Sequence, residues 1–293
     1  MPKTRIVIYR LHRGANASDF QFVREAVNRV ASGAGSFIAG GEHNQVSGAN
    51  SMAAAGSHNE VSGQFCLVSG EHNEITGTHS LAAGDLHQIS SNRSSATGSS
   101  HVLSGEFSAA EGNGNIVSGE GGHAEGGSNE CANQYSHVEG FNAKTYNDYQ
   151  HAKASVGFSN PGELGEAQYT NIIARKETED DTPLMLLVGE EGYIYLEANK
   201  MNAFRVLVVA ASDDNSEGAA YEFKGLIKKD TTTASTAIIG SVTKTVIAES
   251  VSAWDAAITA GTSNGALAIT VTGEAEKVIR WVAFIEMVEV AFN

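Results

Sequence analysis

Residues 99–140 read SSHVLSGEFSAAEG NGNIVSGEGGHAEG GSNECANQYSHVEG, one 14-residue pattern written three times. Each copy ends in glycine, and the same spacing extends toward the N-terminus without a slip. This glycine column comprises Gly56, Gly70, Gly84, Gly98, Gly112, Gly126 and Gly140. A second column, half a period later, holds glycine, serine or asparagine: Gly63, Gly77, Ser91, Gly105, Gly119, Asn133 and Asn147. Glycine, and after it asparagine, tolerates positive φ best, so both columns are predicted to be turns.

Small or aliphatic residues recur at two fixed places between these turns. They lie two residues before the first column, at Ala54, Val68, Ala82, Ala96, Ala110, Ala124 and Val138, and five residues after it, at Val61, Ile75, Ile89, Leu103, Val117 and Cys131. A coiled coil is excluded because a glycine about every seven residues would cost roughly 1 kcal/mol each in a helix. The pattern instead predicts two short strands per repeat, stacked about 4.8 Å apart in a parallel β-solenoid. Because the inward residues are small, one chain buries little apolar surface, and a homotrimer is expected.

The repeats occupy residues 35–155, and a basic segment precedes them. Residues 1–34 are predicted to be an attachment or cap segment. Within it we expect a strand over 5–9 and an amphipathic helix over 20–30, with Asp19 as the helix N-cap.

Two further parts follow the repeats. Residues 156–204 are predicted to be a neck or linker, and residues 205–293 a C-terminal domain. The C-terminal domain contains β-rich runs at 205–211, 219–228, 235–248, 266–272 and 278–290. Short strands separated by turn residues are typical of a β-sandwich, so the whole chain is predicted to be all-β apart from the N-terminal segment.

The charge of the chain excludes several classes of partner. It has 19 basic and 34 acidic residues, a formal net charge of −15. Nucleic acids and anionic membranes select basic faces, so no nucleic-acid partner is expected. No apolar run reaches the roughly 18 residues of a membrane helix, and no secretory signal is recognised, so no membrane insertion is expected.

Four short phrases carry a resemblance to a known family. They are SFIAG at 36–40, SMAAAG at 51–56, GHAEG at 122–126 and SHVEG at 136–140. These phrases resemble the head repeats of YadA-like trimeric autotransporter adhesins, and even more the SHAEG variety found in bacteriophage tail fibres. The resemblance covers about two fifths of the chain and implies a trimeric, left-handed parallel β-roll in an adhesive or structural fibre.

The function implied by this resemblance is that of a phage virion protein, assembled in the host cytoplasm. The first hypothesis is a tail fibre that attaches to a host-surface glycan or protein, with the N-terminal segment docked on other virion proteins. The second is a capsid-bound head or decoration fibre. The third, of a different class, is a tailspike that cleaves polysaccharide.

Columns of titratable residues are interpreted as by-products of the repetition. The histidine columns contain His58 and His72, then His87 and His101, then His123, His137 and His151. No HxH or HExxH spacing is present, so no metal site is predicted. Glu111, Glu125 and Glu139 form an acidic column, but equivalent environments would not separate the pKa values of a catalytic pair. The chain is therefore predicted not to be an enzyme and to need no cofactor.

The aromatic residues of the C-terminal zone are candidates for binding a receptor. Trp254, Trp281 and Tyr221 are the side chains that a sugar-binding tip would use, and the alternative is that they fill the core of a small β-domain. The two cysteines, Cys66 and Cys131, lie about four coils apart, or roughly 19 Å at the usual strand spacing. A disulfide tolerates less than about 7 Å between Cα atoms, so both thiols are predicted to be free and buried.

Overall fold

The computed structural model describes residues 13–24, 26–158, 163–214 and 216–292, in two compact units, Met1–Gly126 and Gly127–Asn293. The strand predicted at 5–9 lies outside the described residues. Helix is nearly absent: the described chain has one short 3₁₀ helix, η1 (Thr233–Ser235), and the rest of its regular structure is β. Within the described residues no helix is long and apolar enough to span a membrane.

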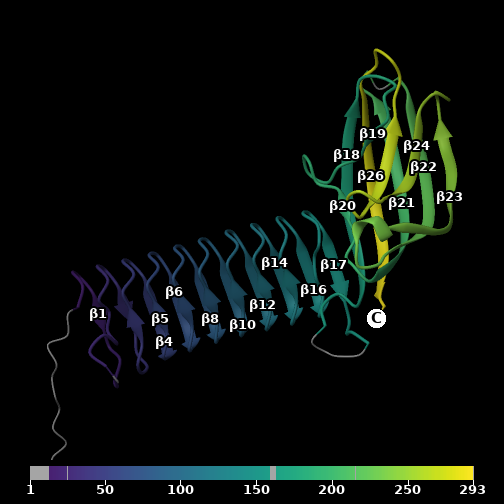
Figure 1. The fold of residues 1–293 in the computed structure, drawn as a ribbon. Coiled ribbons are helices and arrows are strands. Elements are labelled where there is room, and N and C mark those ends of the chain that lie inside the picture. The colour runs from purple at the N-terminus through teal and green to yellow at the C-terminus, as the bar shows by residue number, and fades with distance from the viewer. Residues whose placement is uncertain (1–12, 25, 159–162, 215, 293) are drawn as a thin grey trace, which may run out of the picture. The chain divides into compact units, whose positions relative to one another are not determined.

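The first unit is a parallel β-solenoid, seen as the succession of purple to teal coils in Figure 1. Each coil contributes one strand to a long sheet and one to a second sheet. The long sheet contains β1 (Ser18–Asp19), β2 (Phe37–Ile38), β4 (Met52–Ser57), β6 (Leu67–Glu71), β8 (Leu81–Asp85), β10 (Ser95–Ser99), β12 (Ala109–Asn113) and β14 (His123–Gly127). The second contains β3 (Gln45–Val46), β5 (Glu60–Val61), β7 (Glu74–Ile75), β9 (Gln88–Ile89), β11 (Val102–Leu103) and β13 (Ile116–Val117). The prediction of an all-β chain built on a parallel β-solenoid is confirmed.

The strand register follows the glycine column. Gly98 of β10 pairs with Gly84 of β8 on one side and with Gly112 of β12 on the other. In β4 the register shifts between Ala53 and Gly56 and so accommodates one extra residue. As a result the inward residue of this coil is Ala53, and the predicted Ala54 is only partly buried.

A column of buried polar side chains joins successive coils from the inside. The backbone N–H of Asn73 donates to Oδ1 of Asn59 at 3.1 Å, and Nδ2 of Asn73 donates to the carbonyl oxygen of Gly84 at 2.8 Å. In two successive coils a histidine, His87 and then His101, occupies the asparagine position of this column. The backbone N–H of His101 donates to Nδ1 of His87 at 3.3 Å, and the backbone N–H of Asn115 donates to Nδ1 of His101 at 3.1 Å. Because each Nδ1 accepts, both rings are neutral and carry their proton on Nε2.

This requirement for neutral rings predicts acid sensitivity. Burial lowers the pKa of His87 and of His101. The folded state then binds fewer protons than the unfolded state, so stability is complete above the unfolded pKa of about 6.5 and falls as the pH drops below it. We expect the double variant His87→Asn/His101→Asn, which extends the asparagine column, to flatten the pH dependence of thermal unfolding between pH 7 and 5. The exposed His79→Asn change is the control, and an equal slope in wild type and double variant would contradict the prediction.

A second column, of buried hydroxyl and thiol groups, forms hydrogen bonds to backbone carbonyl groups of the second glycine column. Oγ of Ser51 donates to the carbonyl oxygen of Gly63 at 2.8 Å, and Sγ of Cys66 lies 3.0 Å from that of Gly77. Cys66 and Cys131 are both buried, and burial raises the pKa of the Cys66 thiol. We expect iodoacetamide to label native protein slowly at pH 7.5 and to count two thiols per chain after denaturation. Rapid labelling of both thiols in the native state would contradict this.

The N-terminal segment differs from its prediction. Residues 20–30 form no helix in their described part, and Asp19 lies in β1 instead of capping one. Its carboxylate accepts the backbone N–H groups of Gln21 and Ala31, both at 3.2 Å, and pairs with Arg24 at 2.9 Å. The Gln21 side chain donates to the backbone oxygen of Arg29 at 2.7 Å. These side-chain bonds satisfy the backbone of an irregular first coil, which replaces the helix.

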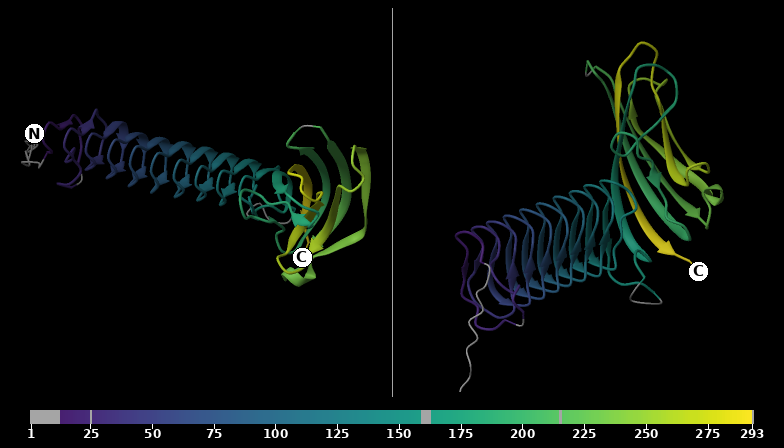
Figure 2. Two further views of the ribbon diagram at one scale, coloured as in Figure 1. Left: turned by 90° about the horizontal axis from the view of Figure 1, so that it is seen from above. Right: turned by 60° about the vertical axis from the view of Figure 1, so that its left-hand side comes forward.

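The second unit combines further coils with two antiparallel sheets. Its parallel strands are β15 (Glu130–Cys131), β16 (His137–Phe141) and β17 (His151–Ala154). The large sheet continues from β17 through β18 (Ala167–Thr178), β26 (Ile279–Ala291), β21 (Lys200–Ser212), β22 (Gly218–Lys229) and β23 (Ala237–Glu249). The small sheet contains β19 (Leu184–Met185), β25 (Ala266–Thr272), β20 (Ile194–Tyr195) and β24 (Asp255–Gly261). Figure 2 shows these strands from two further directions.

One hydrophobic core lies between the two sheets. It includes Ile172 of β18, Leu186 directly after β19, Ile194 of β20 and Phe204 of β21. These residues belong to the segment 156–204 that the sequence analysis assigned to a neck. In the structure this segment supplies β18, β19, β20 and the start of β21, because its alternating apolar residues face the same core as the C-terminal strands.

Candidate functional site

The aromatic residues predicted to bind a receptor are in the core. Trp254, Trp281 and Tyr221 are fully buried, and the two indole rings lie 6.0 Å apart. Nε1 of Trp281 donates to Oγ1 of Thr178 at 3.0 Å, and the Tyr221 hydroxyl donates to the Trp254 carbonyl oxygen at 3.0 Å. Burial and the nearby Glu249 carboxylate raise the pKa of Tyr221. All three side chains belong to the buried core, and Trp281 also forms part of the wall of the groove described next.

A groove of about 480 Å³ lies where β18 and β26 approach the turn after β19. Its lining residues are Arg175, Lys176, Glu177, Leu187, Gly189, Glu190, Arg280, Trp281 and Val282. Nε of Arg280 donates to Oε2 of Glu177 at 3.0 Å. Within the described parts of the chain, Arg175 and Lys176 form no ion pair. Three cations against two carboxylates make the groove locally positive in a chain of net charge −15.

A second cluster of charged side chains is closed to solvent. Nζ of Lys200 lies 3.1 Å from Oε2 of Glu289 and donates to the Tyr146 hydroxyl at 2.7 Å. Oγ1 of Thr170 and Nε2 of Gln168 donate to the same carboxylate at 2.7 and 3.2 Å. Burial lowers the pKa of Lys200 and raises that of Tyr146. The cluster joins β18, β21 and β26, and the Lys200 and Glu289 side chains are each only 4% exposed, so we assign it a structural role.

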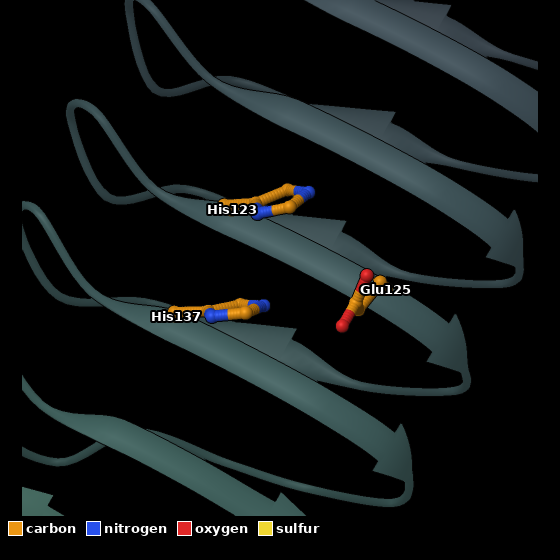
Figure 3. A group of neighbouring side chains, drawn as sticks. All are labelled: His123, Glu125 and His137. Carbon is orange, nitrogen blue, oxygen red and sulfur yellow. The ribbon is translucent and has the colours of Figure 1, made fainter.

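Possible metal-ligand side chains are drawn in Figure 3. His123 and Glu125 lie on β14, and His137 begins β16. Imidazole and carboxylate groups are ligands for zinc and similar ions. Because the first two residues belong to the first unit and His137 to the second, we assign no metal site to them.

The first glycine column has the positive φ that the sequence predicts, whereas bulky exposed residues of the solenoid have a positive φ that the sequence does not suggest. All seven glycines of the first column have φ between +92° and +129°. Positive φ also occurs at the bulky, exposed residues Phe65, His79, Arg93 and Phe107, with φ between +56° and +58°. The ring centroids of Phe65 and His79 lie 4.9 Å apart, and Arg93 lies 5.2 Å from the ring centroid of Phe107. Such side chains carry no signal for positive φ, so only their spacing in the repeat points to these turns.

Comparison with known proteins finds one matching family and several solved structures with a similar fold. The family described as grass antifreeze beta roll matches residues 16–130, which is less than half of the chain. A search of curated proteins finds no match. Among solved structures, the chain is similar to the tailspike protein gp49 of Acinetobacter baumannii bacteriophage Fri1, a capsular polysaccharide depolymerase, with 5% identity over 93% of this chain and 56% of that one and a TM-score of 0.29.

Two further tailspike structures are similar at the same level. One is from Acinetobacter phage vB_ApiP_P1, with 12% identity over 88% of this chain and 51% of that one and a TM-score of 0.21. The other is from Acinetobacter baumannii phage AM24, with 8% identity over 96% and 55% and a TM-score of 0.24. The chain spans about half the length of each. At these TM-scores the likeness assigns no activity to this chain.

One sequence-based prediction is nevertheless corrected by this comparison. The repeats and the lack of a catalytic motif were taken to exclude an enzyme, yet one similar structure is named as a depolymerase. The exclusion of enzymatic activity is therefore wrong as a conclusion from these features.

Proposed function

We propose that this chain is a trimeric component of a phage tail, either a fibre or a tailspike, that engages the host surface. The observation that carries the proposal is the solenoid, whose coils are joined by buried polar columns with hydrogen bonds from coil to coil. This construction supports a rigid spacer, and the SHAEG-like phrases resemble those of phage fibres. In this proposal the coils form a left-handed β-roll, and the second unit is a β-sandwich that carries the contact with the host.

The groove beside Arg175 is the best-suited place in the second unit for a host-surface ligand. Arg175 and Lys176 are cations without an ion pair within the described residues, and guanidinium groups bind carboxylates in a bidentate manner. Leu187 and Val282 supply apolar walls beside them. We infer an acidic polysaccharide as the ligand class, because neutral sugars would leave these charges unmatched.

Binding to model polysaccharides tests this proposal. We expect the purified protein to bind immobilised polygalacturonate but not dextran, and Arg175→Ala to weaken binding at least tenfold. Arg93→Ala removes the same charge from the solenoid and is the matched control, so a general electrostatic effect would weaken both variants equally. Equal effects, or no binding to polygalacturonate by the wild type, would contradict the proposed ligand. New reducing ends in the bound polysaccharide would show that it is also cleaved.

A capsid-bound head or decoration fibre would also use the solenoid as a rigid spacer, so the coils do not distinguish it from a tail component. Immunogold labelling of virions distinguishes the two locations, because the label would lie on the tail in the first case and on the capsid in the second. Label on the capsid alone would contradict the tail assignment.

A further inference from the structure

The groove beside Arg175 contains two guanidinium groups on one face of the large sheet. In the register of β18 and β26, Arg175 lies directly opposite Val282, and Glu177 lies directly opposite Arg280. Alternate residues of a strand point to the same face of a sheet, so these four side chains share a face. Diagonal neighbours in an antiparallel pair lie about 7–8 Å apart, so Arg175 and Arg280 flank the same short stretch of the groove.

The two guanidinium groups differ in what they contact. Arg175 forms no ion pair within the described residues, whereas Nε of Arg280 donates to Oε2 of Glu177 at 3.0 Å. Glu190, the other carboxylate that lines the groove, pairs with no cation in the part of the chain that the structure describes. A carboxylate of a bound polysaccharide and the carboxylate of Glu177 form the same kind of bond to a guanidinium group. The two therefore compete for Arg280.

The Glu177–Arg280 pair is built so that a ligand can displace it. The two side chains are 46% and 70% exposed, so an entering chain has access to both. Solvent screens an exposed ion pair, and its net strength is small. The buried pair of Lys200 and Glu289 is the opposite case, because both of its side chains are only 4% exposed. An acidic chain held by Arg175 can therefore exchange one of its carboxylates for that of Glu177.

We propose that Glu177 is a built-in competitor for the carboxylates of the ligand, and that Arg280 is the second guanidinium group that binds them once Glu177 is displaced. This inference rests on the proposed function of the groove and adds two specificity-determining residues to it. Displacement of Glu177 breaks its bond to Arg280, and a ligand must replace that bond with an acidic group of its own. A neutral sugar cannot do so, and the pair therefore selects against it.

Binding of the full-length protein to immobilised polygalacturonate tests the inference. We expect Glu177→Gln to bind at least about threefold more tightly than the wild type, because the substitution frees Arg280 and removes a repelling charge. Glu222→Gln is the control. Glu222 pairs with Arg205 at 2.7 Å on the same sheet, and neither residue lines the groove. This variant has the same net charge as Glu177→Gln, so its affinity should remain that of the wild type.

The Arg280→Ala background separates competition from simple repulsion. If Glu177 competes for Arg280, the gain in affinity from Glu177→Gln should be at least about threefold larger in the wild type than in the Arg280→Ala background. A carboxylate that only repelled the ligand would give the reverse order or equal gains, because without Arg280 its charge is uncompensated. Both side chains are exposed, so neither substitution opens the core.

The possible results distinguish this inference from the function on which it rests. A larger gain in the presence of Arg280 supports the competitor. Equal gains in the two backgrounds, or a gain from Glu177→Gln no larger than that from Glu222→Gln, overturn it. The proposed ligand then remains intact if the wild type binds polygalacturonate and Arg175→Ala weakens that binding. Absence of binding by both the wild type and Glu177→Gln overturns the competitor and the proposed ligand together.

Discussion

A Gly98→Val variant is expected to lose more than about 4 kcal/mol of unfolding free energy, the range in which single substitutions are exceptional. Gly98 has φ +114°, and a Cβ atom there would lie 2.0 Å from the carbonyl oxygen of Gly112 in the next coil. The three nearest atoms are all backbone atoms of Gly112, so no side chain can move aside, and a β-branched residue is itself an outlier at positive φ. In a homotrimer each chain carries the change. Chemical denaturation followed by circular dichroism measures the loss.

The neighbouring Glu111→Gln variant is the control for this experiment. Glu111 is exposed on the next coil, and its backbone pairs in the same ladder. The substitution changes a solvated side chain without altering the turn, so the expected change is within about 0.5 kcal/mol. If Gly98→Val were as harmless as Glu111→Gln, the glycine column would not be essential for stacking the coils.

The second large effect is expected at the buried ion pair. Glu289→Gln should destabilise the second unit by about 3–5 kcal/mol, because it leaves the Lys200 ammonium buried without its carboxylate. Both side chains are only 4% exposed. The pKa of Lys200 is already lowered by burial, so the folded variant releases this proton before the unfolded chain does. The loss should therefore be largest near pH 7 and shrink as the pH rises toward about 10.4, the pKa of an unfolded lysine.

An exposed pair on the same sheet is the matched comparison. Glu177 and Arg280 lie 3.0 Å apart but are 46% and 70% exposed. Solvent screens such a pair, so Glu177→Gln should cost less than about 1 kcal/mol. Urea denaturation of both variants at pH 7 checks the contrast, and equal effects would show that the Lys200–Glu289 pair is not buried in solution.

The solenoid was predictable because its repeat in sequence is also its repeat in space. From β6 to β12 each residue of the long sheet pairs with the residue 14 positions away, as Gly98 does with Gly112, so local periodicity is enough to define the register there. The turn glycines were identified for the same reason. The bulky residues with positive φ, such as Phe65 and Arg93, were missed because neighbouring coils stabilise a backbone that their side chains do not favour.

The N-terminal helix was predicted from apolar spacing and from Asp19 as its N-cap, and the structure shows why these signals were insufficient. Asp19 and Gln21 bond to the backbone of residues 29–44 and so replace the bonds that a helix would make internally. Phe22 is left exposed, so the amphipathic pattern does not reflect packing in this chain. Such side-chain to backbone bonds between distant residues are not visible as a periodicity.

By itself, then, the sequence determined the β-solenoid, because its contacts join neighbouring repeats. Only the tertiary structure decided the second unit, where β18 pairs with β26 across more than a hundred residues, for example Ile172 with Ile285. That pairing places Trp281 in the core and leaves Ile173 and Phe284 exposed. It also brings Arg175 beside Arg280 in one groove. The alternation along each strand was readable, but which side becomes core depends on the sheet that packs against it.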